Sequence, residues 1–109
     1  EPERVRADVV AFAREASIML DIPFIEASVE VIAGHAGPAY GIPHAATIEA
    51  IRLAGRLEAL PLDPVYSGKG LAGLIALIRE GRWAKGEDIV FLHTGGAPAL
   101  FAYQAALGI

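Results

Sequence analysis

Polar side chains that could take part in catalysis gather between Asp63 and Gly70, where the chain reads Asp-Pro-Val-Tyr-Ser-Gly-Lys-Gly. Hydroxyl side chains followed by glycines are typical of a turn that opens a helix. Tyr66 could form a hydrogen bond or transfer a proton, Ser67 could contact a ligand, and Lys69 could be an electrostatic clamp or an imine-forming amine. Each also has a structural interpretation: a core ring for Tyr66, a helix cap for Ser67, and a solvated first-turn residue for Lys69.

A second turn of the same kind follows the apolar run 89–92, where the chain reads His-Thr-Gly-Gly at 93–96. In open α/β sheets, ligands bind beyond the carboxyl ends of the strands, where glycines let a ligand approach the backbone. Thr94 and Gly95 could contact an anion or a polar ring edge there, although a glycine pair also makes an ordinary tight turn. The glycine-rich nucleotide motifs GxGxxG and GxxxxGK[ST] are absent. If the two turns follow neighbouring strands, we expect them to converge on one pocket.

Tyr40 is a third candidate, since it stands in a loop at 37–43 that is rich in glycine and proline. A loop restricted by prolines can hold the Tyr40 ring against a ligand. Alternatively, the loop only packs on the protein surface. The histidines lack metal-ligand spacing, so we expect no metal; they are His35, His44 and His93.

These candidate residues lie between segments with clear hydrophobic periodicity. Apolar residues recur at spacings of three or four in several segments, which predicts helices, and short apolar or β-branched runs predict strands. The alternation of the two predicts an α/β fold with a mostly parallel sheet and flanking helices. The predicted helices cover 4–20, 47–60, 70–79 and 97–107, and the predicted strands cover 29–33, 60–66 (a short strand or extended loop) and 89–92.

The composition narrows the class of protein. The chain has 109 residues, a formal charge of −4, 54% hydrophobic residues and no cysteine. These values predict one domain without disulfides or thiolate chemistry. The acidic balance, without a Lys/Arg cluster, argues against a nucleic-acid partner. No apolar run approaches the length of a bilayer span and no leader opens the chain, so we expect a cytoplasmic protein without membrane contact.

Three segments together resemble the C-terminal third of the family of D-cysteine desulfhydrases and 1-aminocyclopropane-1-carboxylate (ACC) deaminases. They read Tyr-Gly-Ile-Pro at 40–43, Leu-Asp-Pro-Val-Tyr-Ser-Gly-Lys at 62–69 and His-Thr-Gly-Gly-Ala-Pro-Ala-Leu-Phe-Ala-Tyr at 93–103. The resemblance implies a tryptophan-synthase-β-like, fold-type-II enzyme with the cofactor pyridoxal 5'-phosphate (PLP). It implies that residues 1–109 are a single C-terminal fragment of the cofactor-binding large domain. The Schiff-base lysine, the main phosphate loop and the small domain would then lie upstream.

The resemblance also implies roles for individual residues. Tyr40 and Tyr66 match the catalytic tyrosines on the substrate side of the cofactor. Ser67, Thr94 and Gly95 match cofactor-binding positions beside the ring, with Ser67 standing where the ACC deaminases have glutamate. A hydroxyl supplies only a neutral hydrogen bond to the pyridine nitrogen, whereas a carboxylate favours its protonated, more electron-withdrawing form.

Opening a cyclopropane ring needs stronger electron withdrawal than expelling a thiolate from a β-carbon. The serine therefore favours a PLP-dependent lyase that converts D-cysteine, or a related sulfur amino acid, into pyruvate, ammonia and sulfide. ACC deaminase is the enzymatic alternative, and a non-catalytic α/β binding module is the alternative from another class. The resemblance implies a homodimer whose site needs the remainder of the polypeptide, so we expect the isolated fragment to be inactive.

Overall fold

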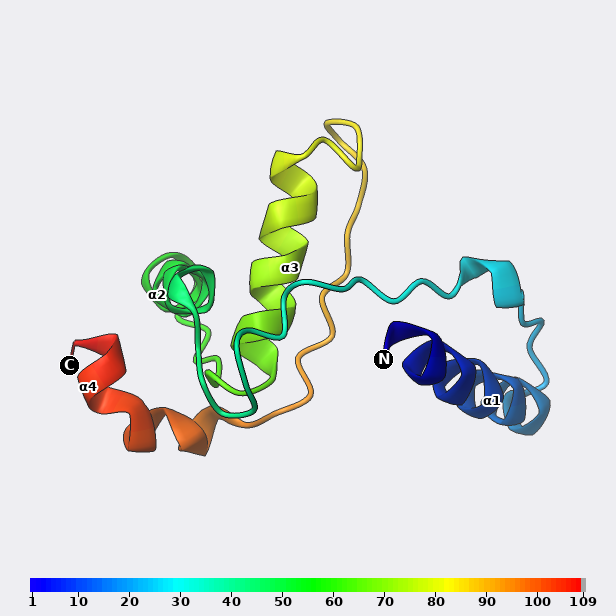
Figure 1. Ribbon diagram of the computed structural model, residues 1–109. Coiled ribbons are helices and arrows are strands. Elements are labelled where there is room, and N and C mark those ends of the chain that lie inside the picture. Colours follow the sequence, from blue (N-terminus) through cyan, green and yellow to red (C-terminus); the bar gives the residue numbers. More distant parts are fainter. Residues whose placement is uncertain (109) are drawn as a thin grey trace. The chain divides into compact units, whose positions relative to one another are not determined.

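The computed structural model describes residues 1–108, which form helices joined by irregular segments (Figure 1). The chain divides into two compact units, of which the first is Glu1–Ala33 and the second begins at Gly34. No helix within residues 1–108 combines the length and apolar character that a membrane crossing requires. The elements are α1 (Pro2–Leu20) and the 3-10 helix η1 (Glu26–Ser28) in the first unit, and α2 (Ala45–Glu58), α3 (Ser67–Arg79), the 3-10 helix η2 (Ala97–Tyr103) and α4 (Gln104–Leu107) in the second.

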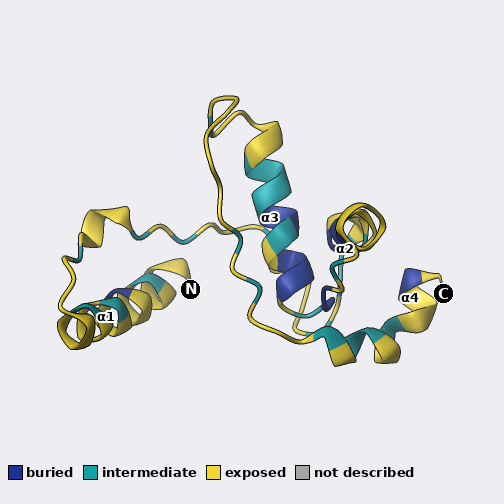
Figure 2. Cartoon of the chain, turned by 180° about the vertical axis from the view of Figure 1, so that it is seen from behind, coloured by how far each residue is buried: buried dark blue, intermediate teal, exposed yellow. Residues whose placement is uncertain are grey.

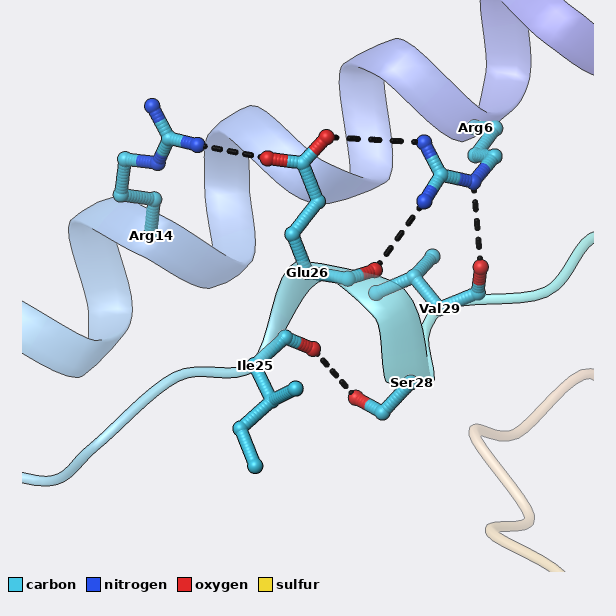
Figure 3. Close-up of polar contacts among 6 residues, drawn as sticks. All are labelled: Arg6, Arg14, Ile25, Glu26, Ser28 and Val29. Atoms are coloured by element: carbon cyan, nitrogen blue, oxygen red, sulfur yellow. Dashed lines mark hydrogen bonds and ion pairs between the residues drawn. The ribbon is translucent and has the colours of Figure 1, made fainter.

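In the first unit, two arginines of α1 hold the segment that contains η1 (Figure 3). Arg6 donates from Nε to the carbonyl oxygen of Val29 at 3.1 Å and from Nη2 to that of Glu26 at 3.0 Å. Arg14 pairs with the Glu26 carboxylate at 2.7 Å. These contacts satisfy backbone carbonyls that would otherwise need a strand partner or water. The contacts hold residues 26–29 against α1, and no sheet is needed to position them.

The second unit has its core where α2 packs against α3. In Figure 2 the buried part of α3 is its N-terminal half, and its C-terminal end is exposed. Gly68 permits the close approach, because a Cβ there would lie 2.6 Å from the carbonyl oxygen of Asp63 and 2.8 Å from Cγ1 of Ile51. The start of α3 is therefore the best-packed part of the helix. The core cluster consists of Ile51, Ala54, Leu62 and Leu107, with Ile48, Leu60, Leu71, Phe91, Leu100 and Tyr103 packed against it.

The predicted α/β fold with a mostly parallel sheet is wrong for the described part of the chain. Residues 1–108 form no β-strand, and their β-pairing is an isolated antiparallel bridge between Ala39 and Ile42. A strand is stable only when neighbouring strands accept and donate its backbone hydrogen bonds, and the segments 29–33, 60–66 and 89–92 do not pair with one another. In the run 89–92, Val90 is 91% and Leu92 is 79% exposed.

The predicted helices are confirmed in position, with shifted ends. The helix predicted over 97–107 forms as the 3-10 helix η2 followed by the short α4. α3 begins at Ser67 instead of Gly70, and α2 begins at Ala45 because the His44 ring accepts a hydrogen bond from the N–H of Thr47 at 3.2 Å.

Candidate active site

The start of α3 is organised by a buried aspartate, Asp63, which the sequence analysis did not single out. Its carboxylate accepts hydrogen bonds from the N–H groups of Val65, Tyr66 and Ser67 at 2.7–2.8 Å and from the Ser67 hydroxyl at 2.6 Å. The first N–H groups of a helix have no partner within the helix, and an anion there also interacts favourably with the helix dipole. Asp63 thus fixes the backbone that presents Tyr66 and Ser67. The signal in the sequence was an Asp-Pro pair with a serine four residues beyond the aspartate.

The environment of Asp63 favours its charged form. Burial by itself raises the pKa of this carboxyl, since Asp63 has no exposed surface. The hydrogen bonds from the Ser67 hydroxyl and from the three backbone N–H groups outweigh that effect, and the pKa lies below its usual 3.8. Asp63 is therefore a carboxylate at neutral pH.

Ser67, predicted to bind the cofactor, is buried as the first residue of α3. Its hydroxyl donates to the Asp63 carboxylate at 2.6 Å and accepts from the Asp63 N–H at 2.9 Å. The hydroxyl proton is thus committed to Asp63, and one oxygen lone pair remains for another donor. The cofactor contact of Ser67 stays a prediction.

Tyr40 and Tyr66, the two predicted catalytic residues, lie side by side although 26 positions separate them. Their hydroxyl oxygens are 2.7 Å apart, and their rings make an edge contact with centroids 5.9 Å apart. Both side chains are largely exposed. The hydrogen bond to Tyr40 raises the pKa of Tyr66 above its usual 10.0, with smaller contributions from burial and from the charges of Tyr40 and Asp63. Tyr66 therefore keeps its proton at neutral pH.

The tyrosine pair lines a hollow of about 490 Å³ in the second unit, together with Lys69. The alternative interpretation of Lys69 as a solvated residue is wrong, because Lys69 is only 8% exposed. Its ammonium donates to the carbonyl oxygens of Ala36 and Ala39. The remaining lining residues of the hollow are Ala36, Gly37, Ala39 and Val65.

The turn at 93–96 approaches Asp63 at Gly96, although neither turn follows a strand in the described residues and the residues of 93–96 do not line the hollow beside Tyr40 and Tyr66. With φ at +95°, a Cβ on Gly96 would lie 2.7 Å from Oδ1 of Asp63, so this close approach requires glycine. Thr94 and Gly95, the other predicted cofactor-binding residues, are exposed, and nothing lies within 4 Å of a Cβ built on Gly95. Nε2 of His93 is buried without a hydrogen-bond partner among the residues described.

Comparison with known proteins identifies the family to which this chain belongs. Residues 3–95 match a family described as "Pyridoxal-phosphate dependent enzyme", and the chain belongs to that family.

Among curated proteins, the chain is similar to enzymes named ACC deaminase. It is 41% identical over 104 residues to the one from Burkholderia vietnamiensis, covering 94% of this chain and 31% of the relative. It is 44% identical over 106 residues to a probable ACC deaminase of Schizosaccharomyces pombe, covering 95% and 31%. A Methylobacterium relative is 42% identical over 107 residues, covering 96% and 32%. The chain thus spans about a third of the length of these relatives.

The residues predicted to hold PLP occupy different surroundings, since Ser67 is buried against Asp63 and Thr94 and Gly95 are exposed. The Ser67 hydroxyl, which donates its proton to Asp63, has only a lone pair to offer a protonated ring nitrogen. The Thr94 hydroxyl is exposed, and the open space beside Gly95 leaves its backbone accessible to a flat group. No cluster of three or more potential metal ligands occurs within the described residues.

Proposed function

We propose that the whole protein is a PLP-dependent enzyme that releases ammonia from a small amino acid. The observation that carries the proposal is the Tyr40–Tyr66 hydroxyl pair, 2.7 Å apart on the wall of a hollow, in a chain of the PLP-dependent family. PLP, when bound, supplies an electron-withdrawing ring that stabilises negative charge at the α-carbon of an amino acid. In the proposal, Ser67, Thr94 and Gly95 hold that ring.

The tyrosine pair is suited to donate a proton. Two hydroxyl groups carry two protons, and their mutual hydrogen bond uses one of them. The other is available to a substrate atom in the hollow. Because the pKa of Tyr66 is raised, Tyr66 keeps its proton at neutral pH and is a hydrogen-bond donor, not a base. We infer that the pair polarises the substrate or protonates its leaving group.

Two substrates are candidates, each favoured by a specific observation. Ser67 favours D-cysteine, since a glutamate is expected at this position in ACC deaminases. The names of the relatives, which are about 40% identical, favour ACC. We propose elimination from D-cysteine as the main reaction and deamination of ACC as the second candidate.

Product analysis separates these candidates. The protein expressed from its complete reading frame is incubated with PLP and either D-cysteine or ACC, and ammonia and sulfide are quantified. Ammonia with sulfide from D-cysteine alone supports the first candidate, and ammonia from ACC alone supports the second. A Tyr66→Phe variant should reduce turnover of the preferred substrate by about 10²- to 10⁴-fold, the usual contribution of general acid catalysis. Absence of ammonia from both substrates, with no bound PLP, would favour a non-catalytic binding module.

The assembly of the whole protein follows from the same resemblance. We propose a cytoplasmic homodimer in which the remainder of the polypeptide supplies the lysine that binds PLP. Sedimentation of the whole protein tests the dimer, and mass spectrometry after borohydride reduction identifies the lysine.

A further inference from the structure

The loop that carries Tyr40 is held to α3 by a single buried cation. The Lys69 ammonium donates to the carbonyl oxygen of Ala36 and, at 3.1 Å, to that of Ala39, the residue just before Tyr40. A Cβ built on Gly37 would lie 3.4 Å from the same nitrogen and 2.9 Å from the carbonyl oxygen of Ile42. The loop is therefore folded closely around the lysine head group.

The position of Lys69 indicates that its contacts with the loop have a specific role. A lysine that is 8% exposed has lost most of its hydration, and neither of its hydrogen-bond partners is a carboxylate. It also stands in the first turn of α3, where the helix dipole disfavours a cation. Both costs are offset by its two charge-assisted hydrogen bonds to the loop.

Lys69 and Tyr66 are neighbours on one rigid element. They stand three residues apart, so the start of α3 fixes Tyr66 directly and the Tyr40 loop through Lys69. On the other side of the loop, the Tyr103 hydroxyl donates to the carbonyl oxygen of Gly41 at 2.7 Å. Within the loop, the N–H of Ile42 donates to the carbonyl oxygen of Ala39 at 3.2 Å.

We propose that Lys69 is a positioning residue that holds the Tyr40 hydroxyl against Tyr66. Its catalytic consequence rests on the proposed function, whereas the tether itself does not. In this proposal Lys69 acts through Tyr40, because its ammonium is engaged with the carbonyl oxygens of Ala36 and Ala39. Displacing a reacting group by about 1 Å costs up to about 100-fold in rate, so loss of the tether should be visible in turnover.

The test compares Lys69→Met with Lys69→Arg and with Lys85→Met, the same substitution at the exposed second lysine of the chain. The tether is the pair of hydrogen bonds from Lys69 to the loop. The rate of amide hydrogen exchange over residues 36–42, measured in the whole protein without substrate, reports whether the tether holds the loop. We expect Lys69→Met to accelerate this exchange at least tenfold, Lys69→Arg to restore part of the protection, and Lys85→Met to leave it unchanged. Unchanged exchange in a folded Lys69→Met protein would overturn the tether.

A double-mutant cycle of Lys69 and Tyr40 then tests whether Lys69 affects catalysis through Tyr40. We expect Lys69→Met to lower kcat about 10- to 100-fold in the wild-type background and less than about twofold when Tyr40 is already phenylalanine. Equal effects in both backgrounds would show that Lys69 does not act through Tyr40. If Lys69→Met fails to fold, Tyr103→Phe, which removes the tether on the other side, enters the same cycle with the same criteria. A wild-type protein that releases no ammonia would refute the proposed function. The exchange data would still show whether Lys69 holds the loop.

Discussion

Replacing Asp63 should destabilise the protein more than replacing any exposed carboxylate, because its side chain accepts hydrogen bonds from four donors at the start of α3. Asp63→Ala leaves all four donors without this acceptor. A buried donor without a partner costs about 1–3 kcal/mol, and the loss of a helix cap costs about 0.5–2 kcal/mol. Since water can reach part of the first turn, we expect a total loss of about 3–4 kcal/mol. Asp63→Asn keeps one acceptor oxygen and should lose about 1–2 kcal/mol.

The effect of Asp63 should depend on pH in a defined direction. The pKa of Asp63 is lowered in the folded protein, so its carboxylate contributes stability that is fully present above the usual pKa of 3.8. That contribution is lost as the pH falls through the lower, folded-state pKa. The difference in unfolding free energy between wild type and Asp63→Asn should therefore be constant near neutral pH and shrink below 3.8.

Urea unfolding of the whole protein measures these differences, with Asp88→Asn as the control at an exposed aspartate. We expect the control to stay within about 0.5 kcal/mol of wild type. An Asp63→Ala protein that unfolds at the same urea concentration as the control would refute the role given to this carboxylate. The role would also be refuted if the difference in unfolding free energy between wild type and Asp63→Asn did not change with pH.

Two further predictions concern the neighbouring turn and the tyrosine pair. Gly96→Ala should lower the free energy of unfolding by about 2–4 kcal/mol, because it combines positive-φ strain with a close contact to Asp63. Gly95→Ala, with open space around its Cβ, should lower it by only about 1–2 kcal/mol through strain. Equal losses of the two variants in thermal or urea unfolding would contradict this. Tyr40→Phe should bring the pKa of Tyr66 back toward 10.0, so that this phenol ionises at lower pH in an ultraviolet titration. An unchanged titration would show that the hydrogen bond to Tyr40 does not raise this pKa.

The helices could be predicted from the sequence because their evidence is local. In 4–20, 47–60 and 70–79, apolar residues recur at helical spacing, and the structure forms α1, α2 and α3 there. The ends were less predictable, because side-chain contacts determine them. The Asp63 carboxylate, for example, brings the start of α3 forward to Ser67. The sheet could not be inferred from apolar runs such as 89–92, because a run indicates a strand only where other strands pair with it.

The candidate site was predicted in part. The family resemblance selected Tyr40 and Tyr66, and the structure places their hydroxyls in contact. Local sequence patterns could not reveal that contact, since it depends on how a loop and a helix start meet. The supporting residues were missed for the same reason: the partners of Lys69 lie 30 and 33 positions away. Asp63 has a local signal in its Asp-Pro pair, but such a pair indicates only a turn.

The central claim, that this chain belongs to a PLP-dependent enzyme acting on a small amino acid, is tested most directly by a visible absorption spectrum. The whole protein is mixed with PLP, separated from free cofactor by gel filtration, and its spectrum recorded before and after adding D-cysteine or ACC. We predict a visible band that elutes with the protein and changes when one of the two amino acids is added. A protein that elutes without a visible band after incubation with PLP would contradict the claim.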